Sequence, residues 1–104
     1  MIEVMVNGCN GKMGQIVTEL VDKNENMVLK CGVDKINTGY LTYPVYTSLN
    51  EIQEKPDVII DFSIPIATFS VLEYAKKNNV PVVIATTGFT GEEEKKIAEY
   101  SNYI

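Results

Sequence analysis

Three glycines stand three residues apart near the start of the chain, in the run Gly8-Cys9-Asn10-Gly11-Lys12-Met13-Gly14. The preceding run, Ile2 to Val6, is apolar apart from one glutamate and predicts a strand, while the residues that follow have helical apolar spacing. We expect the first glycine to permit a sharp turn and the second to let a ligand approach the main chain closely. The third should let the helix pack tightly on the strand. The start of the helix offers unpaired N–H groups and a partial positive charge, so this turn predicts a pyrophosphate site.

A second candidate is Asp34, which follows the apolar run Met27 to Val33 and lies twenty residues after Gly14. In nucleotide-binding folds an acid at the tip of the second strand holds the hydroxyls of a ribose. The simpler interpretation is a tight turn followed by a surface aspartate. Because the glycine turn and the acid occur together at this spacing, the pair favours a dinucleotide.

The remaining pattern alternates strands and helices. The helix after the turn is expected over 12–23, with an apolar stripe on the sheet formed by Met13, Ile16, Val17, Leu20 and Val21. The other expected strands are 27–34, an edge strand 44–47, 57–62, a buried strand 82–85, and a last one beginning at Tyr103. A loop that turns at Gly39 is expected over 35–43, and further helices at 48–55, 66–78 and 90–100, the first and last opened by capping boxes at Ser48 and Thr90.

This alternation predicts an α/β fold: a single domain over residues 1–104 with a Rossmann-type, doubly wound parallel sheet in the strand order 3-2-1-4-5. In that order the winding reverses between the first and fourth strands, and ligands bind in the crevice at their carboxyl ends. Three loops then converge there, namely Gly8–Gly14, Phe62–Ser63 and Ala85–Gly88. The first is expected to hold pyrophosphate, and the other two lie where a nicotinamide ring would reach.

Composition narrows the function classes. The chain has 104 residues and a formal net charge of −5 without a basic cluster, which argues against nucleic acid or an anionic membrane as partner. No apolar run approaches the ~20 residues of a membrane span, and no signal peptide is expected. Cys9 and Cys31 are expected to be too far apart for a disulfide and reduced, as in a cytoplasmic protein. The chain has no histidine, which excludes Ser-His-Asp chemistry and the usual zinc sites, and we expect no metal.

Three motifs taken together resemble a known family. The glycine run, then Asp57-Val58-Ile59-Ile60-Asp61-Phe62-Ser63, then Ala85-Thr86-Thr87-Gly88-Phe89 are similar to the N-terminal half of dihydrodipicolinate reductase, also called 4-hydroxy-tetrahydrodipicolinate reductase. The resemblance covers essentially all 104 residues in order. One departure is Ala85, which stands in place of the first glycine of the family's G-T-T-G.

The resemblance implies reduction of the dihydrodipicolinate precursor with NADH or NADPH, on the diaminopimelate route to lysine. It implies that pyrophosphate binds at Gly8, Cys9, Asn10, Gly11, Lys12, Met13 and Gly14. It places the adenosine ribose at Asp34 and a 2′-phosphate near Lys35, which together suggest tolerance of both cofactors. It places the nicotinamide between Phe62, Ser63, Ala85, Thr86 and Thr87.

The family's paired histidines, its lysine and its S-G-T segment belong to a second, C-terminal domain, and so no catalytic residue is expected in these 104 residues. The chain is therefore interpreted as the isolated cofactor-binding half, which binds cofactor without turnover. By the resemblance, the small-molecule substrate is expected to bind through the missing half. Family members assemble as homotetramers through that half, so the chain without it can be monomeric.

Three alternatives stay open. A coenzyme A or acyl-CoA ligase module also uses G-x-x-G-x-x-G, but Asp34 suits a ribose diol better than a 3′-phosphate. A non-catalytic sensor of NADH is disfavoured by the missing DNA-binding domain and the negative charge. Another NAD-dependent dehydrogenase, of the homoserine or aspartate type, fits the glycine turn, but the two later motifs favour the reductase.

Overall fold

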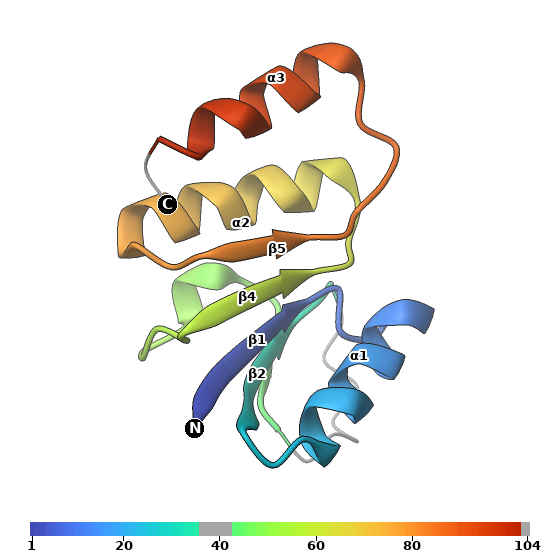
Figure 1. The fold of residues 1–104 in the computed structure, drawn as a ribbon, viewed down its shortest axis with the longest axis vertical. Coiled ribbons are helices and arrows are strands. Elements are labelled where there is room, and N and C mark those ends of the chain that lie inside the picture. Colours follow the sequence, from blue (N-terminus) through green and yellow to red (C-terminus); the bar gives the residue numbers. More distant parts are fainter. Residues whose placement is uncertain (36–42, 103–104) are drawn as a thin grey trace.

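A parallel sheet of five strands forms the centre of the computed structural model, which describes residues 1–35 and 43–102 (Figure 1). The strands are β1 (Ile2–Asn7), β2 (Met27–Val33), β3 (Val45–Tyr46), β4 (Val58–Asp61) and β5 (Val82–Ile84). The helices are α1 (Lys12–Lys23), α2 (Pro65–Asn78), α3 (Gly91–Tyr100) and the short 3-10 helix η1 (Leu49–Glu51). The sheet order is β3-β2-β1-β4-β5, so the predicted fold class and strand order are confirmed.

The two faces of the sheet carry separate hydrophobic clusters, because successive side chains of a strand point to opposite faces. Val4 and Val6 of β1 pack with Val21 of α1 on one face. Met5, between them, packs with residues of α2 such as Val71 on the other face. Figure 1 shows α1 and α2 on opposite sides of the sheet, with α3 lying outside α2. All of these β1 side chains are fully buried, as a central parallel strand requires.

Helix α1 turns a different face to the sheet from the one that its apolar residues predict. Met13, Ile16 and Leu20 are 50, 45 and 64% exposed, whereas Gly14, Thr18 and Val21 are buried. The predicted stripe of α1 is therefore wrong in part, since only Val17 and Val21 pack on the core. The cause is the close contact at Gly14, where a Cβ atom would lie 2.0 Å from the Gly8 carbonyl oxygen. Only glycine fits at this contact, so α1 is rotated to place Gly14 against the turn.

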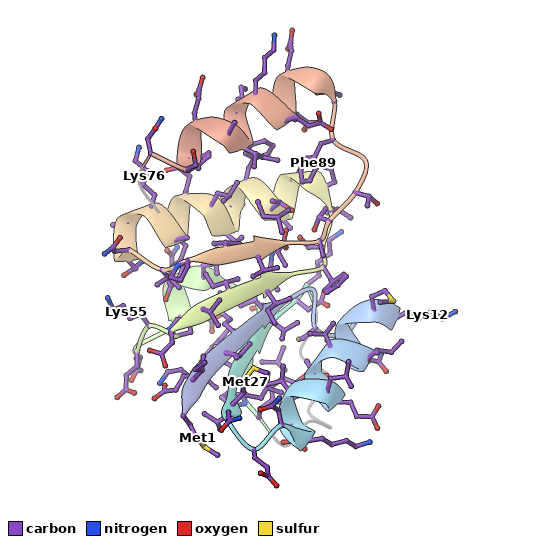
Figure 2. The ribbon with its side chains drawn as sticks, in the orientation of Figure 1. Met1, Lys12, Met27, Lys55, Lys76 and Phe89 are labelled. Atoms are coloured by element: carbon purple, nitrogen blue, oxygen red, sulfur yellow. The ribbon has the colours of Figure 1, made fainter. Side chains whose placement is uncertain are left out.

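Strand β5 was expected to be buried, and this expectation is also wrong. Val83, its central residue, is 55% exposed. Among the described residues β5 lies at the edge of the sheet, paired only with β4. The following helix packs on α2, where the Phe89 and Phe69 rings meet edge to face at 6.1 Å, and Figure 2 shows Phe89 between the two helices.

Both capping boxes form. The hydroxyl of Thr90 accepts a hydrogen bond from Glu93 N at 3.1 Å while Thr90 N donates to the Glu93 carboxylate, and α3 follows as expected. Ser48 and Glu51 form the same arrangement, but the helix that they open is only η1. The chain becomes extended at Ile52, whose side chain packs against the hydrophobic cluster that contains Met5 and Val71.

The expected turn at Gly39 and the expected strand at Tyr103 fall outside the described residues. Among the helices of the described ranges, none combines the length and the apolar character that crossing a membrane requires.

Candidate functional site

The turn between β1 and α1 is held by close backbone contacts at its first and third glycines. Gly8 has a φ of +82°, and a Cβ atom there would lie 2.1 Å from the Phe62 carbonyl oxygen. Gly14 packs equally closely on the other side of Gly8, against its carbonyl oxygen. Any side chain at either position would displace backbone, so the fold itself requires glycine at both.

Gly11, the central glycine, differs. A Cβ atom at Gly11 would have its nearest contact at 3.4 Å, an ordinary van der Waals distance, and the residue has a φ of −69° that any amino acid adopts. Gly11 is exposed and is the N-cap residue of α1, a helix start that no side chain caps. The protein's own packing therefore does not require glycine here, and the position leaves room for a ligand against the helix N-terminus.

A cleft of about 1230 Å³ opens beside this turn, at the carboxyl ends of β1, β2 and β4. Gly8, Gly11, Asp34, Lys35, Phe62 and Ser63 line it, so the structure brings six of the predicted binding residues together. This is the edge at which the winding of the sheet reverses, where doubly wound folds bind their ligands.

Asp34 faces this turn. Its carboxylate accepts a hydrogen bond from Asn10 N at 2.8 Å and another from Lys35 N at 2.7 Å, which ties the end of β2 to the glycine turn. A carboxylate offers about four acceptor sites, so Asp34 can still accept from hydroxyl groups in the cleft.

Four of the other predicted phosphate-site residues hold the turn or face away from the cleft. The Cys9 side chain is fully buried in the hydrophobic cluster that contains Val6 and Val21, and burial raises the pKa of its thiol. Gly14 packs on Gly8, and Met13 lies half-exposed on the outer side of α1. Figure 2 shows Lys12 projecting into solvent from the start of α1.

The cysteines behave as small core residues. Cys9 and Cys31 are both buried free thiols, and burial raises the pKa of Cys31 to about 11. Reactive cysteines need an exposed thiolate, so neither thiol is poised for chemistry near neutral pH.

The three predicted residues after β5 lie on the neighbouring loop. Ala85 N donates to the Asp61 carbonyl at 2.9 Å, which continues the pairing of β4 and β5. The Thr86 side chain is buried and its hydroxyl accepts from Ser63 N at 2.8 Å, so the two expected nicotinamide loops are joined. Thr87 is exposed.

Asp61 was not among the predicted site residues. It ends β4 with no exposed surface, and its carboxylate lies at the centre of the polar groups beneath the cleft. A signal was present: Asn7 and Asp61 are paired residues at the ends of two strands whose other residues are apolar except for Glu3. Polar groups at the paired ends of buried strands need partners, and such groups are expected near the functional edge of a parallel sheet.

The far wall of the cleft was also missed. It is formed by Ser48, the N-cap of η1, by Asn50 within η1, and by Ser70 and Tyr74 of α2. Their local pattern shows only a capped turn and a helix flank, so nothing in it points to a cleft.

Known proteins match the chain along its whole length. The model of the family described as "Dihydrodipicolinate reductase, N-terminus" matches residues 2–104. The chain belongs to this family. The 4-hydroxy-tetrahydrodipicolinate reductases of Caldanaerobacter subterraneus and Clostridium novyi are 46% and 40% identical to it over 104 residues, in each case all of this chain and 41% of the relative.

A solved structure agrees with the dihydrodipicolinate reductase assignment. The dipicolinate-bound dihydrodipicolinate reductase from Paenisporosarcina sp. TG-14 superposes with a TM-score of 0.80 at 34% identity, over 97% of this chain and 43% of that one. This member of the dihydrodipicolinate reductase family thus spans about two fifths of the length of the relatives that it matches.

Proposed function

We propose that the cleft beside the glycine turn binds NADH or NADPH, and that residues 1–104 are the dinucleotide-binding domain of a reductase. The observation that carries the proposal is Gly11: it lies at the cleft, at the uncapped start of α1, where the protein itself does not require glycine. A main chain without Cβ at a helix N-terminus suits the close approach of a pyrophosphate. Such a nucleotide, when bound, supplies hydride for reduction.

The residues of the chain have distinct roles in this proposal. The N–H groups at the start of α1 hold the phosphates, and the Asp34 carboxylate accepts hydrogen bonds from the adenosine ribose. Phe62 and Ser63 line the cleft and border the nicotinamide, while the loop from Ala85 to Thr87 lies beside them, outside the cleft lining, and supports that end of the site.

The substrate is inferred from the names of the relatives. We propose hydride transfer to 4-hydroxy-tetrahydrodipicolinate, in the biosynthesis of diaminopimelate and lysine. The chain spans 41% of the length of these relatives, and we propose that the groups that bind this substrate and donate a proton lie in the part of such a reductase that these 104 residues do not match. The 104-residue chain is expected to bind cofactor without turnover, and measurable reduction of the substrate by it would contradict this division of roles.

The decisive experiment replaces Gly11 by alanine and measures the dissociation constant of NADH by its fluorescence. Alanine at this position clears the protein's own atoms but projects a methyl group toward the phosphate site. We expect the free energy of unfolding to change by no more than about 1 kcal/mol, as for an exchange at an N-cap position. The affinity for NADH should fall by a factor of about 5 to 150, since a clash with the ligand costs about 1–3 kcal/mol.

Gly91→Ala is the matched control, because Gly91 is the first residue of α3 and a Cβ atom there meets nothing within 4 Å. Its NADH affinity should equal that of the unchanged chain. Saturable binding that Gly11→Ala leaves intact would overturn the assignment of the phosphate site.

The choice between the two cofactors depends on Asp34 and Lys35, which lie side by side at the cleft. A carboxylate repels a 2′-phosphate, whereas a lysine attracts it. We propose that the opposed charges let both cofactors bind. Dissociation constants of NADH and NADPH that differ by less than about tenfold, or 1.4 kcal/mol, would support this, and a larger difference would contradict it.

A further inference from the structure

The buried carboxylate of Asp61 collects hydrogen bonds from four segments of the chain. One oxygen accepts from Asn7 Nδ2 at 2.9 Å and from Ser63 Oγ at 2.5 Å. The other accepts from Thr68 Oγ1 at 2.5 Å and from Thr86 Oγ1 at 2.8 Å. The donors belong to the end of β1, the loop after β4, the first turns of α2 and the loop after β5. A single side chain thus joins every segment that meets beneath the cleft on this side.

The core does not need a carboxylate at this point. Moving a carboxylate out of water costs several kcal/mol even after the protein relaxes, and only good hydrogen bonds offset that cost. Ile59 and Ile60, just before Asp61, show that β4 otherwise carries apolar residues. Four donors match the roughly four acceptor sites of a carboxylate, so the group is fully satisfied and has little freedom to move.

Thr86 extends the restraint from Asp61 to the main chain of the site. A threonine hydroxyl has one proton, and Thr86 donates it to Asp61, which leaves its lone pairs for Ser63 N at 2.8 Å. Asp61 therefore sets the direction in which Thr86 accepts, and Thr86 in turn fixes the peptide group between Phe62 and Ser63. The carbonyl of that peptide is the one against which Gly8 packs.

We propose that Asp61 is a positioning residue: its carboxylate locks the loops that follow β4 and β5 in the arrangement that receives the nicotinamide half of the dinucleotide. This rests on the proposed function. The glycine turn has its own anchors, Gly8 N to the Val33 carbonyl at 2.7 Å and Asn10 N to Asp34 at 2.8 Å, and neither involves Asp61. Loss of the Asp61 carboxylate should therefore affect one end of the cofactor site and spare the other.

The test compares two ligands in the variant Asp61→Asn, which keeps the shape but turns an NH₂ group toward hydrogen-bond donors. The ligands are NADH and ADP, which carries the adenosine and the two phosphates but no nicotinamide. We expect NADH affinity to fall about tenfold or more, as for loss of hydrogen bonds to a charged group, while ADP affinity changes by less than about twofold.

Asp57→Asn is the matched control. Asp57 lies just before the other end of the same strand, is exposed, and accepts one bond from Glu3 N at 2.8 Å. Both dissociation constants should be unchanged in this variant. Circular dichroism establishes that each variant is folded.

Thr86→Val decides the question if Asp61→Asn does not fold, because valine matches threonine in size and leaves Asp61 three donors. It should show the same selective loss for NADH, and Thr86→Ser, which keeps the hydroxyl, should restore it. Equal losses for NADH and ADP, or no loss for either, would overturn the positioning role. If the unchanged chain binds neither ligand, the proposed function itself fails, and that outcome is distinct from the others.

Discussion

At Gly14 the start of α1 comes so close to the preceding turn that a Cβ atom would lie 2.9 Å from the Cys9 Cα and nearer still to the Gly8 carbonyl oxygen. Both neighbours are backbone atoms, which cannot move aside as a flexible side chain can. The same residue type therefore serves two purposes in one turn: Gly14 and Gly8 permit the fold, while Gly11 leaves space for a ligand.

A prediction at the scale of the residue follows for Gly14→Ala. The added methyl group must push α1 away from β1, and we expect a loss of about 3 kcal/mol or more in the free energy of unfolding, the upper range for overpacking. Urea denaturation measures it, with Gly91→Ala as the neutral reference. A Gly14→Ala chain as stable as the reference would show that the turn does not pack as described.

At the scale of the element, α1 shows how one contact outweighs an apolar pattern. Met13, Ile16 and Leu20 are apolar and exposed, while the buried face runs through Gly14, Thr18 and Val21. The two faces differ by about one residue along the helix, or roughly 100° of rotation. That rotation is set by Gly14, the position at which the helix can approach the turn.

Adjacent residues of α1 test this orientation. Leu20→Gln should change the free energy of unfolding by no more than about 0.5 kcal/mol, as is usual for surface positions. Val21→Ala removes buried methyl groups and should cost about 1–3 kcal/mol. Thermal or urea unfolding of the pair gives the comparison; the reverse order, with Leu20 the costlier position, would favour the apolar stripe over the observed face.

At the scale of the whole molecule, burial of ionisable groups makes the fold sensitive to alkali. Burial raises the pKa of Cys31 to about 11 and that of Tyr43 to about 12. Both groups are neutral when protonated, so the folded state holds its protons at a pH at which the unfolded chain has lost them. The stability due to these groups is complete at about pH 8 and below, and it declines as the pH rises through about 9 toward 12.

We therefore expect the free energy of unfolding to be roughly 1–2 kcal/mol smaller at pH 10 than at pH 8. Urea denaturation at the two values measures it. Cys31→Val fills the same buried space without a titrating thiol and should show a smaller decrease. An equal decrease in that variant would assign the alkaline sensitivity to other groups.

Much of this architecture could be predicted from local sequence. The glycine turn, the capping boxes at Ser48 and Thr90 and the alternation of strands with helices are short-range features, and together with the winding rules of parallel sheets they predicted the strand order. Gly8, Asp34 and Ser63 were predicted as binding residues because each stands just after a recognisable strand, and Gly11 because it is the central glycine of the turn. The exposure of Val83 does not follow from its local sequence, because an edge strand and a central strand can have the same apolar composition. It follows instead from the predicted strand order, in which this strand comes last.

Sequence alone determined which elements form and which strand ends meet, since these depend on backbone propensities and on residue types within a few positions. The tertiary structure decided the face that α1 presents and the partners of Asp61. The bonds to the Asp61 carboxylate come from residues 54, 2, 7 and 25 positions away along the chain. A carboxylate can leave water only where such donors converge, and their convergence depends on how the elements pack in three dimensions.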